Sequence, residues 1–319
     1  MDALLDRLAV LLLSPGSTLS IWSLLAAGLV VAGVAVARRR GRALPLKVLA
    51  RSIVPRSLLG ASGRADIGFT LMAVFVSAAL FGWAIASYLV IADAVADALG
   101  RPLAFGLPVW LAVGATTLAL WLAYELAYFV DHYLSHKVPV LWAFHKVHHS
   151  AESLSPLTVF RVHPVDSIVF YNIVALFTGV TAGAMRWLVG EGVSPWTISG
   201  ANVLAIAGMM TIKHLHHSHA WIAWGGVWGR LILSPAHHQI HHSVAREHHD
   251  RNFGDVLGVF DWLAGTLHVP QAKREALTFG VEGLACPHSA YGALVAPFVD
   301  AISPPTAAAP TPTCDVVAA

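Results

Sequence analysis

Long apolar stretches alternate with short polar ones along this chain, and their lengths predict membrane-spanning helices. A helix rises about 1.5 Å per residue, so crossing a hydrocarbon core of about 30 Å takes roughly 20 apolar residues. We expect about three spans followed by a helical hairpin. Five stretches without charged side chains approach or reach the required length, at residues 17–37, 67–92, 102–124, 167–185 and 192–212.

The hairpin consists of the last two stretches, which are joined by only a few residues around Arg186 and Glu191. Its arms are expected either to cross the membrane fully or to dip in and return. The first stretch is too long for the core of a signal peptide, lacks a basic leader and has no evident cleavage site. We therefore interpret it as a retained span.

Composition supports the same class of protein. Hydrophobic residues make up 56% of the chain and charged residues 12%, whereas soluble domains contain about a quarter charged residues. The chain is therefore expected to be an all-α integral membrane protein, and no nucleic-acid partner is expected.

The distribution of basic residues predicts the orientation. Residues 38–64 contain eight Lys or Arg and no Asp or Glu, which places this loop in the cytoplasm by the positive-inside rule. Counting crossings from there, the segment 131–163 and everything after Lys213 are cytoplasmic too. Sixteen of the eighteen histidines lie between His132 and His249, at the cytoplasmic ends of spans or in cytoplasmic segments. They can therefore converge on one shared site.

Three short motifs repeat histidine at helical spacing. Residues three and four apart on a helix share one face, so the rings within each motif point the same way. A single zinc ion takes three or four protein ligands, so eight imidazoles suit two metal ions. The motifs comprise His132 and His136, then His145, His148 and His149, then His238, His241 and His242.

A fourth run of histidines ends the fifth apolar stretch. Spacing alone does not decide which of its rings face a metal site and which face water. The run contains His214, His216, His217 and His219.

Together these motifs resemble the membrane fatty acid hydroxylase and sterol desaturase superfamily. The resemblance covers about residues 120–270, roughly half the chain. The residues around the histidine clusters are most similar to those of bacterial sterol-desaturase-like proteins and of the alkylglycerol monooxygenase branch. The motifs are, in order, DHYLSHK, LWAFHKVHHSAE, RVHP, HHSHAWIAWG, SPAHHQIHHS, HDRNFG and FDWLAGT.

The resemblance implies a histidine-rich helical cap that holds two metal ions, taken to be iron in the active enzyme. In the final motif it selects His238 and not His237, and in the fourth run it selects the histidine of a His-Ser pair, His217. The implied ligands are His132, His136, His145, His148, His149, His217, His238, His241 and His242.

Some positions depart from the family pattern or have several interpretations. Some relatives carry a further ligand where this chain has Lys213, so His214 is a candidate replacement, and His248 is another candidate. Asp131 and Asp250 adjoin the clusters and are candidates for holding imidazole tautomers, although a helix cap or a solvated residue is equally expected. The roles of five further histidines stay open, namely His163, His216, His219, His237 and His249.

The activity that the resemblance implies is oxygenation of a lipid. Non-haem iron needs imidazole or oxygen ligands and open coordination positions. In hydroxylation, O2 and two electrons insert one oxygen into a C–H bond and release water, while desaturation stays open on the same site. The substrate class extends from sterols to acyl chains, ether lipids and aminolipids. The expected location is a bacterial inner membrane with the site on the cytoplasmic side.

Electrons must come from a separate reductase or ferredoxin. The chain has only two cysteines and no GxGxxG motif, so it lacks an iron-sulfur ligand set and a dinucleotide site. Zinc is an alternative metal in recombinant protein, because imidazole accepts both ions. A membrane zinc-dependent hydrolase is the alternative function, although its usual HExxH motif does not occur. A metal transporter would need ligands inside its spans, whereas these histidines are expected at one face of the membrane.

Four regions are expected along the chain. Residues 1–119 form an N-terminal transmembrane region with the basic loop, and residues 120–270 form the catalytic domain. Residues 271–302 form a cytoplasmic extension. Residues 303–319 are rich in Pro, Ala and Thr and are expected to be a disordered tail.

Overall fold

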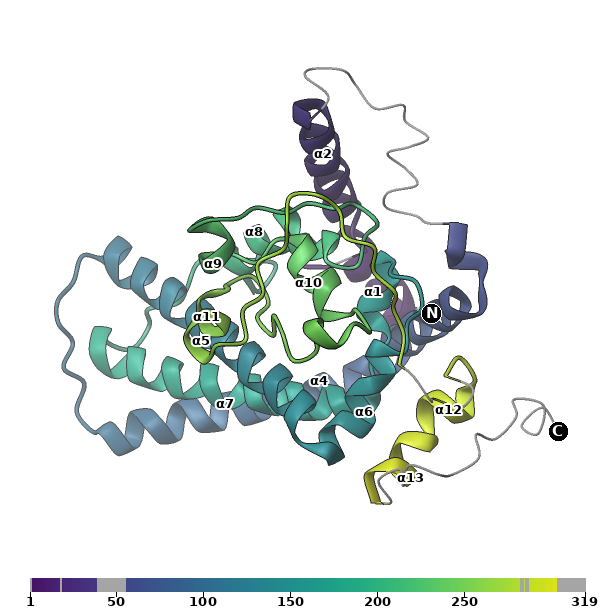
Figure 1. Cartoon of the computed structure of the whole chain (residues 1–319). Helices are drawn as coiled ribbons and strands as arrows, with labels where there is room; N and C mark the ends of the chain where they lie inside the picture. Colours follow the sequence, from purple (N-terminus) through teal and green to yellow (C-terminus); the bar gives the residue numbers. More distant parts are fainter. Residues whose placement is uncertain (1, 18, 39–55, 282–283, 285–286, 303–319) are drawn as a thin grey trace.

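The computed structural model describes residues 2–17, 19–38, 56–281, 284 and 287–302 (Figure 1). Within them most of the chain is helical, and the only strands are two antiparallel ones of two residues each, β1 (Thr197–Ile198) and β2 (Ala201–Asn202). The prediction of an all-α membrane protein is confirmed. The tail predicted at 303–319 and most of the basic loop lie outside the described residues.

The helices vary widely in length. Four short 3-10 helices are η1 (Arg56–Leu59), η2 (Pro156–Phe160), η3 (Lys213–Leu215) and η4 (Arg246–His248). The α-helices are α1 (Asp2–Leu13), α2 (Ile21–Arg38), α4 (Ala61–Leu99), α5 (Val109–Lys137), α6 (Pro139–His149), α7 (Pro164–Val189), α8 (Val203–Thr211), α9 (Trp228–Leu231), α10 (Pro235–His241), α11 (Val259–Ala264), α12 (Ala290–Leu294) and α13 (Ala296–Ile302).

Within the described residues, α2, α5 and α7 are long and apolar enough to cross a membrane. The predicted span at 67–92 lies inside α4, which has 39 residues. α5 begins at Val109 and not at residue 102, because the preceding segment turns at Ala104 and Gly106, which both have positive φ. At its other end α5 continues to Lys137, so two histidines of the first motif extend directly from the apolar part of the helix.

The second arm of the hairpin is shorter than the apolar stretch at 192–212. α8 has nine residues, which at about 1.5 Å per residue cross less than half of a hydrocarbon core. The tight β1–β2 turn precedes it, with positive φ at Ser199 and Gly200. Asn202 then caps α8 by accepting a hydrogen bond from Leu204 N at 2.9 Å. Of the two arrangements left open, the arm that dips in and returns fits this helix.

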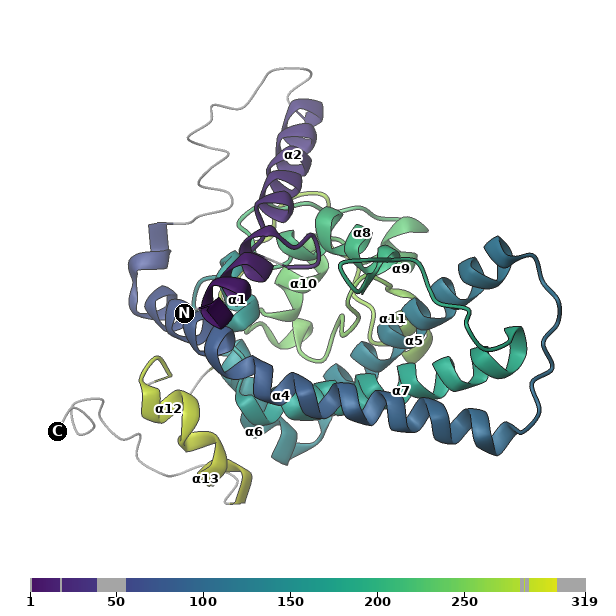
Figure 2. The same ribbon diagram turned by 180° about the vertical axis from the view of Figure 1, so that it is seen from behind.

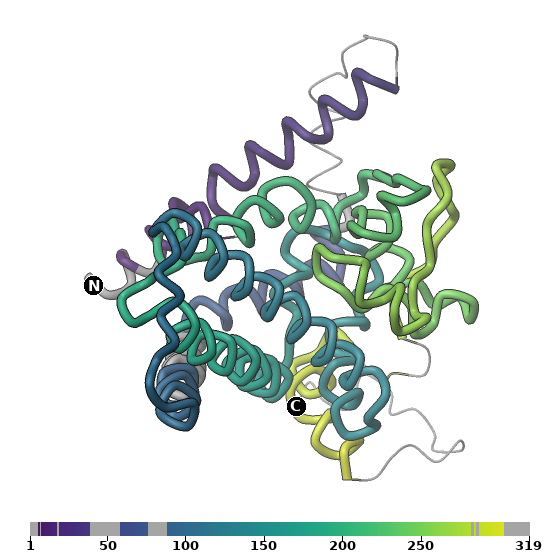
Figure 3. Tube along the Cα trace, turned by 90° about the vertical axis from the view of Figure 1, so that its left-hand side faces the viewer, coloured from purple at the N-terminus to yellow at the C-terminus, as the bar shows by residue number. Residues whose placement is uncertain are grey.

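Helices α4, α5 and α7 lie side by side, and α10 lies in the middle of the fold near one end of this bundle (Figures 1 and 2). α7 packs against both of the other long helices. α4 and α7 run in the same direction. α5, which lies between them in the sequence, runs in the opposite direction, so the end of α5 and the start of α7 meet near α6. α2 projects away from the bundle (Figure 3).

Two glycines let α7 approach α4 closely. A Cβ added at Gly179 would lie 2.9 Å from Cβ of Ile91, and one at Gly183 would lie 2.5 Å from the carbonyl oxygen of Ala92. Small residues four apart are typical of helix pairs in membranes, where close backbone contact replaces the hydrophobic driving force. This contact fixes α7, whose first turn carries the buried carboxylate of Asp166.

We expect Gly183→Ala to destabilise the protein by about 1–3 kcal/mol, because the added methyl group overpacks the contact with α4. Gly33→Ala on α2 is the matched control, since nothing lies within 4 Å of its added Cβ and alanine is the better helix former. Thermal unfolding in detergent measures both. Equal melting temperatures for the two variants would contradict the close α4–α7 contact.

Candidate metal centre

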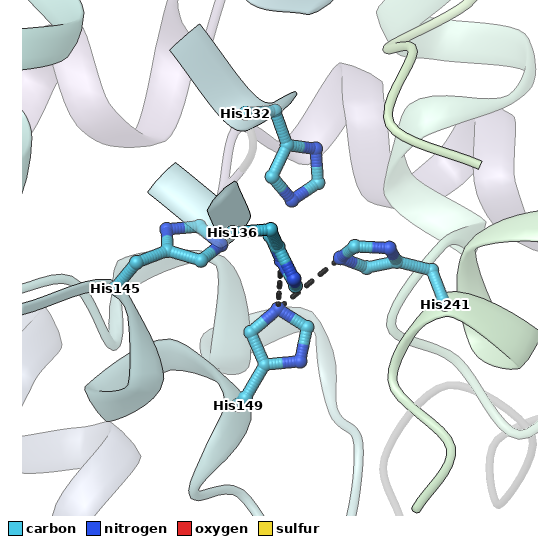
Figure 4. A group of neighbouring side chains, drawn as sticks. All are labelled: His132, His136, His145, His149 and His241. Carbon is cyan, nitrogen blue, oxygen red and sulfur yellow. Dashed lines mark hydrogen bonds between the residues drawn. The ribbon is translucent and has the colours of Figure 1, made fainter. Parts of the chain in front are cut away.

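Five histidines from three helices form a first group (Figure 4). α5 contributes His132 and His136, α6 contributes His145 and His149, and α10 contributes His241. One ligand nitrogen of each lies within 4.8 Å of the others. Nε2 of His149 is 3.1 Å from Nε2 of His136 and 3.1 Å from Nε2 of His241.

Four buried histidines form a second group. His148 comes from α6, His217 follows η3, His238 lies on α10, and His242 is the C-cap of α10. Nε2 of His217 lies 3.3 Å from His148, 3.2 Å from His242 and 3.0 Å from His238, each measured to Nε2.

Each HxxHH motif divides between the two groups. α6 gives two rings to the first group and one, His148, to the second, whereas α10 gives one ring, His241, to the first group. The rings of His149 and His242 stack with centroids 4.5 Å apart, so the groups are adjacent. Together the groups contain all nine histidines that the resemblance implies as ligands.

The spacing of these nitrogens fits metal ions. Imidazole nitrogens bound at about 2.0–2.1 Å from an ion lie about 2.9–3.4 Å from one another in tetrahedral or octahedral geometry. The Nε2 pairs in both groups lie 3.0–3.3 Å apart. Nine imidazoles without a carboxylate ligand suit divalent transition metals and not calcium or magnesium.

The outer nitrogens of several rings are held by hydrogen bonds, which sets the tautomer. Nδ1 of His132 donates to the carbonyl oxygen of Phe253 at 2.8 Å, and Nδ1 of His241 donates to that of Arg251 at 2.7 Å. Because a proton on Nδ1 leaves the Nε2 lone pair free, these bonds direct a lone pair into the group.

Carboxylates from two other helices also accept hydrogen bonds at the site, one from a ring and the other from a loop. Nδ1 of His145 donates to Asp166 on α7 at 3.2 Å. Asp261 on α11 accepts hydrogen bonds from the backbone N–H of Phe253 at 2.8 Å and of Gly254 at 2.7 Å. Asp261 thereby fixes the loop that carries the carbonyl oxygen bound by His132. Asp261 lies in the FDWLAGT motif of the family resemblance, but the sequence alone gave no sign of its role.

Burial sets the charge of these rings. Desolvation lowers the pKa of His148, His217 and His238 well below the usual value, and neighbouring histidines lower it further. Desolvation also lowers the pKa of His241 to about 3. These four rings are therefore neutral at pH 7, and protons do not compete with a metal ion for their nitrogens.

Other candidate histidines lie elsewhere. His214 is buried but joins neither group, and its ring nitrogens have no hydrogen-bond partner in the described part of the chain. His248 also lies outside both groups, in a third cluster. His237 bonds the hydroxyl of Ser234 at 2.7 Å, and His163 caps the first turn of α7.

The remaining histidines of this region border the groups. His216 stacks on His238 with ring centroids 4.8 Å apart. His249 is exposed and bonds the carbonyl oxygen of Val244 at 3.2 Å, while His219 is partly buried.

The carboxylates proposed from the sequence take different places. Asp250 lies 2.5 Å from Nζ of Lys137 and 3.9 Å from Nδ1 of His136. Asp131 is buried on α5, and its Oδ1 has no partner among the described residues. Their action on imidazole tautomers stays a prediction.

A pocket of about 460 Å³ opens onto both groups. Its inner wall includes His136, His149, His241 and His242. The rest of its lining combines apolar and polar side chains, including Trp142, Val244, Arg246, His249, Asp250 and Val281.

Comparison with known proteins points to one class. Residues 117–266, which include all nine histidines, match the family model described as fatty acid hydroxylase. Over this part of the chain, the resemblance to the fatty acid hydroxylase and sterol desaturase superfamily is confirmed.

Individual relatives match the same part of the chain. Alkylglycerol monooxygenase of Homo sapiens is 25% identical over 150 residues, covering 46% of this chain and 28% of that protein. Ornithine lipid hydroxylase OlsE of Rhizobium tropici is 27% identical over 149 residues, covering 47% of this chain and 40% of that protein. The chain therefore spans less than half the length of either relative. No solved structure matches the chain significantly.

The lowered pKa values predict acid sensitivity of the metal-free protein. Histidine that is neutral in the fold and has a pKa of about 6.5 when unfolded stabilises the fold above that pH. This stability is lost as the pH falls from about 6.5 towards the folded pKa, which is about 3 for His241. The melting temperature in chelator should therefore fall steeply between pH 7.5 and 5.

The matched variant replaces His217 and His242 by Gln, which removes two titrating rings and keeps polar side chains of similar size. Its melting temperature should depend less on pH than that of the unchanged protein. Parallel pH profiles would show that these rings are not the origin of the acid sensitivity.

Proposed function

We propose that this chain is a membrane-bound non-haem diiron oxygenase that hydroxylates a C–H bond of a lipid. The observation that carries the proposal is the pair of adjacent all-histidine groups, each of which contains Nε2 atoms 3.0–3.3 Å apart. The first group would hold one iron ion through five histidines and the second would hold the other through four. Two bound iron ions supply activation of O2 with two external electrons, so that one oxygen enters the substrate and the other leaves as water.

The protein contributes orientation and exclusion of water. The carbonyl oxygens of Arg251 and Phe253 and the carboxylate of Asp166 keep protons on the outer ring nitrogens. All nine histidines except His136 are buried. Uncharged imidazoles would leave the positive charge of bound ions uncompensated in a site of low polarity.

The pocket supports an amphipathic substrate. Trp142 contacts the rings of both His136 and His149, with centroids 5.0 and 5.5 Å apart, and gives the inner pocket an apolar wall. Arg246 and Asp250 lie at its polar side. A lipid could therefore place a C–H bond at the ions while its headgroup contacts charged side chains. The names of the relatives, an alkylglycerol monooxygenase and an ornithine lipid hydroxylase, support polar lipids as the substrate class.

The long apolar helices support a position of this site at a membrane. We place the site at the cytoplasmic face of a bacterial inner membrane, because the basic residues at 38–64 precede α4, whose start lies on the site side of the bundle. A separate reductase or ferredoxin would deliver electrons there.

Comparative lipidomics tests the reaction. Cells with the active gene should contain a lipid that has gained one oxygen, and His241→Ala should reduce it by more than about 100-fold, because a ligand of the first group is lost. Glu247→Gln, an exposed substitution outside both groups, should leave the product unchanged. A loss of two hydrogens in place of the oxygen gain would indicate desaturation. No lipid change that depends on His241 would sink the oxygenase proposal.

Metal analysis separates the rival classes. Protein purified without oxygen should contain two irons per chain, because the structure offers two groups. His149→Ala should reduce the iron content, since His149 lies in the first group and stacks on a ring of the second. One zinc per chain, with hydrolytic activity on a lipid ester, would favour the membrane hydrolase.

A further inference from the structure

A third cluster of metal-binding side chains lies outside the two histidine groups. It consists of His248, His268 and Glu275, whose ligand atoms all lie within 4.8 Å of one another. The proposed oxygenation gives these side chains no role. The sequence offered His248 only as a further ligand of the two-metal site.

Three separate segments bring the cluster together. His248 ends η4, His268 follows α11, and Glu275 lies in the irregular segment beyond it. The two rings meet edge to face with centroids 5.1 Å apart. Nε2 of His248 is 3.6 Å from Oε2 of Glu275, which is too long for a hydrogen bond. Two ligands of one zinc ion lie about 3.4 Å apart, so this separation suits a shared ion.

An unpartnered polar atom gives a second, independent sign of a ligand. Only 6% of the surface of His248 is exposed, and its Nδ1 has no hydrogen-bond partner in the described residues. Burying a ring nitrogen without a partner is costly, so such atoms usually bind water, an ion or another group.

The backbone around the cluster is rigidly connected. Oδ1 of Asn252 accepts a hydrogen bond from the backbone N–H of His268 at 2.7 Å, and Nδ2 of Asn252 donates to the carbonyl oxygen of His268 at 2.9 Å. The backbone N–H of Asn252 donates to the carbonyl oxygen of Thr266 at 3.1 Å. These bonds hold His268 against the loop that begins at His248.

We propose that His248, His268 and Glu275 bind a zinc ion that is separate from the two histidine groups. Two imidazoles and one carboxylate form a common zinc ligand set, with water as the fourth ligand. The side chain of Glu275 is 26% exposed, so water and an entering ion can reach it.

The position of this site gives the ion a structural role. The loop after His248 supplies the carbonyl oxygens of Arg251 and Phe253, which accept hydrogen bonds from His241 and His132. By tying the start of this loop to the segment that carries Glu275, the zinc ion holds both carbonyl oxygens in place. It therefore supports the orientation of two rings in the first group without binding to that group.

Zinc titration of the full-length protein in detergent, after removal of metals by a chelator, tests the proposal. The unchanged protein should bind three zinc ions per chain, one in each cluster, and Glu275→Gln should bind one fewer. The matched control is Glu247→Gln, which neutralises an exposed carboxylate next to His248 and should keep full binding. Glu275→His restores a zinc ligand and should also keep full binding, which separates lost ligation from lost folding.

A second background isolates the third site. The double variant His149→Ala and His217→Ala removes one ligand from each histidine group, which weakens zinc binding there, and should keep the zinc ion of the third cluster. Adding zinc to it should raise its melting temperature, and adding His248→Gln should reduce both that rise and the zinc bound by one ion per chain. Equal zinc uptake in the unchanged protein and Glu275→Gln would overturn the proposal, as would equal losses in Glu275→Gln and Glu247→Gln.

Discussion

Nine buried imidazoles with lone pairs directed inward are the constraint on which the rest of this structure depends. Nitrogens 3.0–3.3 Å apart repel when both present lone pairs, and water is excluded from most of them. A cation between the rings would relieve that repulsion, and outer contacts keep the rings pointing inward. The carboxylates of Asp166 and Asp261 serve this purpose, one by binding the ring of His145 and the other by fixing a loop. The apparent excess of histidine thus requires an equally specific set of neighbours.

The membrane bundle supplies the frame for these contacts. α5 is apolar at its start and carries His132 and His136 near its end, so one continuous helix joins the hydrocarbon region to the metal centre. The close approach of α7 to α4 at Gly183 fixes the helix that presents Asp166 to α6. Packing within the bundle therefore fixes the positions of site residues that lie at the ends of α5 and α7.

Much of this arrangement could be predicted from the chain. Apolar length located the long helices, and helical spacing located the histidine motifs. Spacing did not reveal that each HxxHH motif divides between two groups, because rings that share one face of a helix can still diverge towards two centres. The carbonyl partners at Arg251 and Phe253 were also hidden, since every residue has a carbonyl group and only the fold selects two of them. α8 is short because a tight turn uses half of its apolar stretch, and average hydropathy does not register a turn.

The division of each motif has a thermodynamic consequence. α6 and α10 each hold ligands of both groups, so occupation of one group orders the helices that the other group needs. Each ion then lowers the entropy cost of binding the next, which makes the two binding events positively coupled. Such linkage would disfavour the half-loaded protein, in which only one of the two groups holds an ion.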